Sequence, residues 1–230
     1  YQGNRARYFA DKANIFRFQN KNDFVICDAT VSRRIKTKGK KIIAKPLLPS
    51  FSFNLKGMHN RKNAGLAVQT ARLLGISEES IQRSLPTFSG VPGRLEFVRT
   101  VRGIEIYNDT TATTPDATIA GLKALGNKKN IILIMGGNHK NLDMRSLLKL
   151  IPRYTKKVIL LPGTGTALLP ESFKQKSILV GSLKDAVDAA MKNARRGDII
   201  LFSPAFTSFG LFKNEFDRGE QFNKIVRRLK

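Results

Sequence analysis

The hydrophobic and polar positions of this sequence follow two different patterns, and the change comes near residue 90. Beyond it, short apolar runs typical of buried strands alternate with segments whose apolar residues recur every three or four positions, as in amphipathic helices. Strands are predicted over residues 95–101, 104–107, 130–135, 157–161, 177–180 and 198–202. Helices are predicted over residues 115–125, 144–151, 183–195 and 214–229. Strands that alternate with helices across short loops predict an α/β fold, a mostly parallel sheet covered by helices.

Residues at the ends of two of these elements support their bounds. Pro115 suits a first helical turn with Thr113 or Thr114 as the N-cap, and Gly126 ends that helix. The first two strands turn at Arg102-Gly103 and are expected to pair with each other.

The first 90 residues are patterned less regularly. Strand or helix-end pieces are predicted at 14–17 and 23–28, hairpins at 33–52, and helices at 60–74 and 77–85. The lysines of the hairpin region are expected at exposed positions, and Ser77 is expected to cap the last helix. Turn-forming residues at 86–92 indicate a boundary, so we expect two domains, residues 1–91 and 92–230.

Length and composition limit the class of protein. The chain has 230 residues, and its 41% hydrophobic content is enough for a packed core, which excludes disorder along the whole chain. Its one cysteine, Cys27, has no partner for an internal disulfide, which favours a reducing compartment. No apolar run approaches the roughly 20 residues that span a bilayer. Because the sequence opens at Tyr1, we interpret it as a piece of a longer cytoplasmic protein.

The net charge of +24 makes nucleic acid a possible partner, because clustered Lys and Arg release counterions from phosphate backbones. The surplus is spread evenly, however, with 12 charges in residues 1–92 and 12 in the remainder. The one dense run, residues 33–45, has no interleaved aromatic residues for base stacking. A solvated basic surface or a potential that attracts anionic substrates such as nucleotides explains the charge equally well.

Polar clusters occur at strand ends and at the starts of helices, where open α/β sheets bind ligands. The four clusters are residues 57–63, residues 94–96 with 108–115, residues 136–143, and residues 203–219. An Asp followed by hydroxyl residues before a helix, as at Asp109, suits the ribose or phosphates of a nucleotide. The alternative for that cluster is an Asx-turn with an N-cap, and the alternative for residues 57–63 is a plain helix start capped by Asn60 or Asn63.

The other clusters offer anion-binding groups. Gly136-Gly137 after a buried strand lets a ligand approach the backbone, and Lys140 is placed to meet a carboxylate or phosphate. The serine-rich loop after residue 202 offers hydroxyls. His139 has only His59 as a second histidine, so a loop role is favoured over metal binding, and Cys27 is expected to be buried and inert.

Taken together and in order, these clusters resemble the Mur ligases, the ATP-dependent amino-acid-adding enzymes of peptidoglycan synthesis. The motifs that carry the resemblance are GMHNRKNAGLAV, GVPGRLEFV, YNDTTATTPDAT, ILIMGGNHKNLD and SPAFTSFGLFKNEFDRGEQF. The resemblance implies a Rossmann-like C-terminal domain over residues 92–230, preceded by the end of the α/β central ATPase domain. It also implies a ligase that joins D-glutamate to UDP-N-acetylmuramoyl-L-alanine with ATP and Mg²⁺. A Mur or folylpolyglutamate-type ligase for another amino acid is the alternative enzyme.

The resemblance also implies roles for single residues. Lys12 matches the lysine that the family carbamylates, which would make it a catalytic residue and, only in that form, an oxygen ligand near Mg²⁺. Asn63 matches an adenine-side contact, and Arg94 and Asp109 match contacts to the phosphates and ribose of ATP.

The D-glutamate contacts of the family match Thr113, Lys140 and Ser208, one ammonium and two hydroxyls that can pair with carboxylates. Two positions depart from the pattern, Thr111 in place of a lysine and Glu215 in place of a phenylalanine. The glycine-rich loop GxxxxGK[ST] is absent; the GTGT sequence at 163–166 lacks its lysine. We therefore expect residues 1–230 to be inactive alone. No membrane or nucleic-acid partner is expected, and the protein is expected to be a monomer.

Overall fold

The computed structural model describes residues 4–208 and 211–230. The chain divides into two compact units, Tyr1–Ser89 and Gly90–Lys230, which we call unit 1 and unit 2. Unit 1 ends two residues before the boundary predicted from the sequence.

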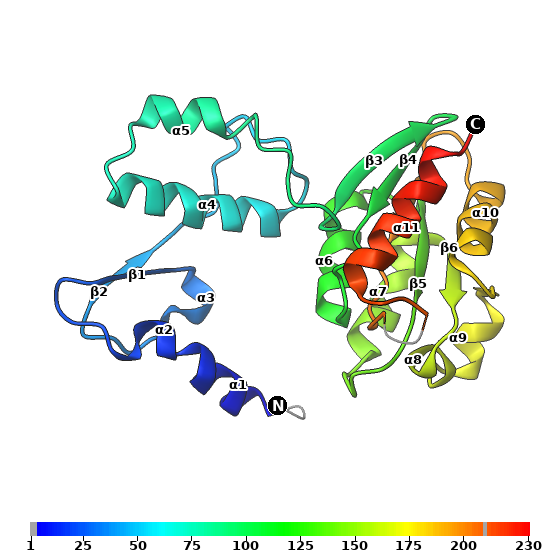
Figure 1. Ribbon diagram of the computed structural model, residues 1–230, viewed down its shortest axis with the longest axis horizontal. Coiled ribbons are helices and arrows are strands. Elements are labelled where there is room, and N and C mark those ends of the chain that lie inside the picture. Colours follow the sequence, from blue (N-terminus) through cyan, green and yellow to red (C-terminus); the bar gives the residue numbers. More distant parts are fainter. Residues whose placement is uncertain (1–3, 209–210) are drawn as a thin grey trace. The chain divides into compact units, whose positions relative to one another are not determined.

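A six-stranded sheet forms the middle of unit 2, in the order β3-β4-β8-β5-β6-β7 (Figure 1). Its strands are β3 (Glu96–Val101), β4 (Ile104–Asn108), β5 (Ile131–Gly136), β6 (Thr155–Leu161), β7 (Ile178–Leu179) and β8 (Ile199–Phe202). β3 runs antiparallel to β4, and the other pairs are parallel. The mostly parallel sheet is thus confirmed, as is the strand pair that turns at Arg102-Gly103, both with positive φ.

Helices cover both faces of this sheet. They are α6 (Pro115–Leu125), α7 (Arg145–Tyr154), α8 (Thr164–Ala167), α9 (Glu171–Gln175), α10 (Leu183–Asn193) and α11 (Glu215–Arg227). Leu133 of β5 belongs to the core under α6 and α7, and its neighbour Ile134 belongs to the core under α10 and α11. Every residue of β5 is buried, which explains why its sequence is an uninterrupted apolar run.

The helix ends follow the expected capping chemistry. Thr114 is the N-cap of α6 and its side chain accepts from the Ala117 amide, while Gly126 is the C-cap. In unit 1, Ser77 caps α5 (Glu78–Ser84) and accepts from the Ser80 amide. α4 (Met58–Leu73) begins earlier than expected, and neither Asn60 nor Asn63 caps it, because Gly57 is its N-cap.

Unit 1 is built around a small parallel pair, β1 (Phe24–Cys27) and β2 (Lys40–Ile43). The predicted hairpins at 33–52 are wrong. Asp28 caps α3 (Ala29–Ser32), which carries the chain back, so that β2 runs parallel to β1. Exposed lysines along a strand do not distinguish these pairings, because they mark a solvent-facing strand in either direction.

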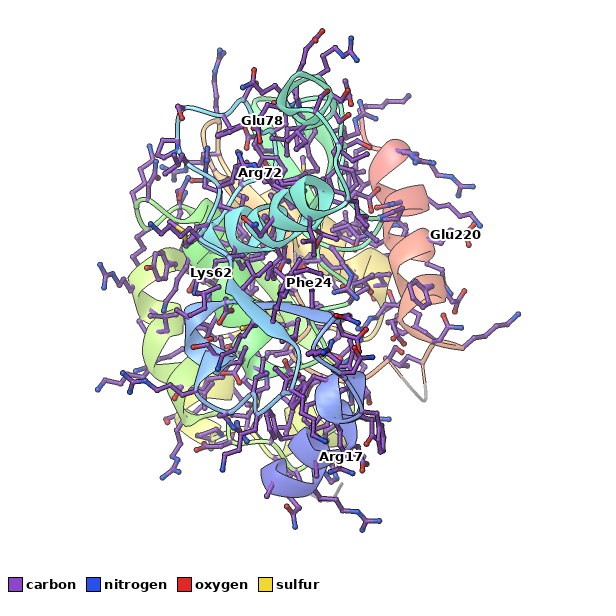
Figure 2. All side chains as sticks on the ribbon, turned by 90° about the vertical axis from the view of Figure 1, so that its left-hand side faces the viewer. Arg17, Phe24, Lys62, Arg72, Glu78 and Glu220 are labelled. Carbon is purple, nitrogen blue, oxygen red and sulfur yellow. The ribbon has the colours of Figure 1, made fainter. Side chains whose placement is uncertain are left out.

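The remaining helices of unit 1 are α1 (Arg5–Lys12) and α2 (Asn14–Arg17), which share a cluster with β1 through Phe9, Phe16 and Val25. A second cluster joins α4 and α5 through Val68 and Ile81. At the surface, Arg72 of α4 forms an ion pair with Glu78 at the start of α5 (Figure 2). Cys27 is buried, as expected.

Candidate functional site

The loops after β4, β8 and β5 lie side by side at the carboxyl edge of the unit 2 sheet, because these three strands are adjacent and parallel. The chain continues from β4 and β5 to helices on one face of the sheet and from β8 to α11 on the other face. Open α/β sheets bind ligands at such a point, beyond the carboxyl ends of neighbouring strands that lead to opposite faces.

Lys140 and Thr113 meet at this edge, although they come from loops after different strands. The Lys140 Nζ donates to the Thr113 Oγ1 over 3.2 Å. Lys140 is exposed and belongs to none of the ion pairs among the described residues. Its charge is therefore free to pair with a carboxylate or phosphate of a ligand.

Ser208 lies in the loop after β8 and is only 4% exposed. Its Oγ is buried and has no hydrogen-bond partner among the residues that the structure describes. An unpaired buried hydroxyl costs roughly 1–3 kcal/mol, and so each instance in a native fold calls for an explanation. A position kept for a ligand oxygen is one such explanation.

Asp109, directly after β4, is buried, and both of its carboxylate oxygens have partners. Oδ1 accepts from the Leu95 amide over 3.0 Å, and Oδ2 accepts from the Ser203 hydroxyl over 2.8 Å. Burial raises the pKa of Asp109 to about 7, although these two hydrogen bonds and the charge of Arg94 act in the opposite direction. Asp109 thus anchors the segment that carries Arg94, whose own side chain is exposed.

Arg218 of α11 is a buried residue that sequence reasoning missed. It is 1% exposed, and its guanidinium donates to the Thr110 carbonyl (2.7 Å), the Thr110 Oγ1 (3.1 Å) and the Phe206 carbonyl (3.4 Å). Desolvation lowers the pKa of Arg218 to about 10, so it stays charged at neutral pH. The sequence signal for its burial is its spacing, because Arg218 lies on the same helical stripe as the buried residues Phe222 and Val226.

Gly137 after β5 and Gly163 after β6 lie against backbone of neighbouring loops rather than open space. A Cβ on Gly137, whose φ is +135°, would lie 2.3 Å from the Thr207 carbonyl oxygen. A Cβ on Gly163 would lie equally close, 2.3 Å, to the Gly137 carbonyl carbon. The loops after β5, β6 and β8 therefore pack backbone against backbone at the carboxyl edge of the sheet.

A cavity of about 180 Å³ lies on the α7–α8 side of Lys140. Its walls are mostly apolar, with Leu142, Leu169 and Phe206 among them, and Lys140 stands at its margin. Neither Thr113 nor Ser208 lines it. The cavity is thus a neighbouring hollow, and it does not coincide with the residues expected to hold the amino acid.

Two of the predicted site residues belong to unit 1. Lys12 is exposed at the end of α1, with its Nζ 5.7 Å from the centre of the Tyr8 ring, and Asn63 is exposed on α4. Within the described part of the chain, no group of three or more His, Cys, Asp or Glu side chains is arranged to hold a metal ion. None of the described helices has the length and apolar character needed to cross a membrane.

Comparison with known proteins identifies the family to which this chain belongs. The sequence model of the Mur ligase, glutamate ligase domain matches residues 93–206. The chain belongs to the Mur ligase family. It is 35% identical to the UDP-N-acetylmuramoylalanine--D-glutamate ligase of Borreliella afzelii, over 98% of this chain and 56% of that protein. It is 40% identical to the enzyme of the same name from Caldanaerobacter subterraneus, over 76% of this chain and 39% of that protein.

Solved structures share the fold at low sequence identity. MurF ligase from Thermotoga maritima, in complex with ADP, has a TM-score of 0.66 and 18% identity and covers 99% of this chain and 59% of its own. Folylpolyglutamate synthase from Mycobacterium tuberculosis has a TM-score of 0.69 and 14% identity, over 100% of this chain and 62% of its own. The chain spans about half the length of the curated relatives that it matches.

Proposed function

We propose that this chain is part of an ATP-dependent ligase of peptidoglycan precursor synthesis that adds D-glutamate to UDP-N-acetylmuramoyl-L-alanine. The observation that carries the proposal is the meeting of Lys140 and Thr113 across two loops. The loop after β8 adds the buried hydroxyl of Ser208, which has no hydrogen-bond partner among the described residues. The names of relatives that align with most of this chain support the same reaction.

Binding of the amino acid is the part of the reaction that unit 2 serves best. One ammonium and two hydroxyls provide donors for both carboxylates of glutamate and leave its amine without a partner. A free amine held in a fixed orientation is what the reaction needs, because the amine is the nucleophile.

The nucleotide side of the proposed site would be formed by Arg94 and Asp109. Arg94 is exposed and cationic, which suits a phosphate, and Asp109 fixes the backbone on which Arg94 stands. Asn63 of unit 1 is proposed as the adenine-side contact.

In the proposed reaction, ATP transfers its γ-phosphoryl group to the terminal alanine carboxylate of the acceptor and leaves as ADP. The amine of D-glutamate then attacks the carbonyl carbon of this acyl phosphate, and inorganic phosphate leaves as the amide bond forms and the amine loses its proton. Positioning and charge stabilisation account for most of the catalysis in reactions of this type.

Magnesium is the cofactor least supported by this chain. The described residues have no acidic cluster that would hold it, and Lys12 would supply an oxygen ligand only as a carbamate. We therefore derive no step through the metal. Unit 1 is proposed as the end of the central ATPase domain, and unit 2 as the C-terminal ligase domain. We also propose a monomer in the cytoplasm, where ATP is available.

The test is a ligation assay with the whole protein, supplied with ATP, the UDP-linked acceptor and a panel of amino acids. D-glutamate should be the preferred amino acid, and Lys140→Met should raise its KM roughly 10- to 100-fold, because a charge-assisted contact is lost. Lys149→Met, which removes an exposed lysine of α7, is the matched control and should leave the KM unchanged.

Two results would overturn the proposal. Preference for another amino acid would favour the related-ligase alternative, which Thr111 and Glu215 keep open. ATP-dependent phosphate release by residues 1–230 alone would contradict the division of the active site between this chain and the remainder of the protein.

A further inference from the structure

Arg218 has an unusual environment for a charged side chain. It is almost fully buried, and no ion pair of residues 4–208 and 211–230 includes it. The charge of Glu215 acts on Arg218, but the two side chains form no ion pair. A buried charge without an ion-pair partner is costly and persists only where its hydrogen bonds are needed. The partners of Arg218 are carbonyl and hydroxyl oxygens, so it ties backbone segments together instead of neutralising a carboxylate.

These oxygens belong to the two loops that carry the proposed amino-acid contacts. Thr110 lies three residues before Thr113, and Phe206 lies two residues before Ser208. The planar guanidinium has donors on three nitrogens, and it uses all three here, two toward Thr110 and one toward Phe206. Arg218 thus joins the two loops, together with a backbone hydrogen bond that the Ala205 amide donates to the Ala112 carbonyl over 2.8 Å.

The neighbouring residue allows this close approach of α11. A Cβ on Gly219 would lie 2.5 Å from the Thr110 Cγ2, so a larger residue would hold the helix away from the loop. The contact is reinforced by the Thr110 hydroxyl, which donates to the Glu215 carbonyl, and by the Asn108 side chain, which donates to the Gly219 carbonyl.

We propose that Arg218 is a positioning residue that sets the distance between the Thr113 and Ser208 contacts for the amino-acid substrate. This inference depends on the proposed function for its substrate. It does not make Arg218 a catalytic residue, because the side chain is only 1% exposed and each of its three nitrogens donates to an oxygen of the protein.

The alternative is that Arg218 only stabilises the fold. Phe222, one turn further along α11, is 0% exposed and stacks on Phe202 with ring centres 4.6 Å apart, and it has no part in either loop. Phe222→Leu is therefore the matched control, because it loosens the same helix without touching the bridge.

The experiment compares Arg218→Met, Arg218→Lys and Phe222→Leu in the whole protein, by ligation kinetics and by hydrogen–deuterium exchange. Arg218→Met should raise the KM for D-glutamate ~10-fold or more, because displaced contacts lose their alignment. It should also speed exchange in residues 109–114 and 203–208 while β4 and β8 stay protected. Arg218→Lys should restore the KM only in part, since one ammonium cannot span both loops. Phe222→Leu should lower the thermal midpoint but leave the KM within about twofold.

The inference would be overturned if Arg218→Met and Phe222→Leu changed the KM equally at equal losses of thermal midpoint. Full restoration of the KM by Arg218→Lys would also overturn it, because charge alone would then explain the effect. A wild-type protein that does not use D-glutamate would refute the proposed function, and the exchange comparison would still decide whether Arg218 holds the two loops.

Discussion

Ser208 and Asp109 are both buried at the carboxyl edge of one sheet, but their surroundings are opposite. Asp109 has a protein partner for each carboxylate oxygen, whereas the Ser208 hydroxyl has none within residues 4–208 and 211–230. A satisfied buried group stabilises the fold, and an unsatisfied one weakens it. The two residues should therefore respond differently when they are changed.

Replacing Ser208 by alanine should separate binding from stability. Ser208→Ala removes an unpaired hydroxyl, so we expect the free energy of unfolding to stay the same or rise by about 1 kcal/mol. Affinity for D-glutamate should fall, because a donor to its carboxylate is lost. Denaturant titration and calorimetric titration of the amino acid measure the two effects. Ser203→Ala, which breaks the bond to Asp109, is the control and should lower stability; a similar loss in Ser208→Ala would contradict the prediction.

The pH dependence of stability should report on Asp109. Burial raises its pKa to about 7 in the folded chain, whereas an exposed aspartate titrates near about 4. The folded chain then keeps a proton that the unfolded chain has lost. The contribution of Asp109 is thus complete below about pH 4 and is lost as the pH rises through about 7, with a slope of at most about 1.4 kcal/mol per pH unit.

Asp109→Asn removes this titration while keeping groups that can bond to Leu95 and Ser203. Free energies of unfolding, measured by denaturant titration between pH 5 and pH 7, should fall more steeply for the wild type than for the variant. Equal slopes would show that Asp109 is ionised in the folded chain.

Some site residues could be predicted from the sequence and others could not. Lys140 and Thr113 follow strands at positions where a parallel sheet brings loops together, so their meeting is a consequence of topology. Arg218 was missed because it stands inside a helical stripe that otherwise predicts only core packing. No pattern shows which oxygens an isolated buried charge will bond.

Helices and strands were predicted correctly from the sequence where the residues of the element and its immediate neighbours determine it. The apolar run of β5 and the caps at Thr114 and Ser77 each fix an element from neighbouring residues alone. The direction of β2 was not predictable in this way, because it depends on whether residues 28–39 form a turn or a short helix. Pairing between distant segments is decided by packing, which a local pattern does not contain.

The packing of α4 provides a test at this scale. Gly65 lies in the helix interior, where alanine would ordinarily stabilise by about 1 kcal/mol. Here a Cβ would lie 2.0 Å from the Lys45 carbonyl oxygen. Gly65→Ala should therefore lower the free energy of unfolding of unit 1 by about 1–3 kcal/mol, because overpacking outweighs helix propensity. Hydrogen exchange of α4 amides measures the loss.

The control for this variant is Ala67→Gly, at an exposed position of the same helix. It should cost about 1 kcal/mol through propensity alone. A stabilising Gly65→Ala would show that the segment after β2 can move away from α4.

For the whole molecule, the dominant physical quantity is the net charge of +24. The ion pairs of the described residues mostly join exposed side chains, which contribute little to stability. Repulsion among the surplus cations should therefore decide how the chain responds to salt.

Raising the sodium chloride concentration from about 20 mM to about 200 mM should raise the thermal midpoint by roughly 2–5 °C, because the added ions screen this repulsion. Calorimetry measures the midpoint. A fall would mean that the ion pairs outweigh the repulsion. In the same buffers, binding of an unrelated DNA duplex should be lost at the higher salt concentration, because only unspecific charge contacts are expected. Tight binding of the DNA duplex at the higher salt concentration would favour nucleic acid as the partner.

The backbone packing of Gly137 against Thr207, and of Gly163 against Gly137, has a consequence for how such a protein can change its substrate. Because backbone atoms of the facing loop lie 2.3 Å from the place of a Cβ at each glycine, a methyl group added at either one would displace that loop. New amino-acid preferences must then arise at positions outside these backbone contacts, such as 111 and 140. Selection for a different substrate would act at those positions, while Gly137 and Gly163 would stay unchanged.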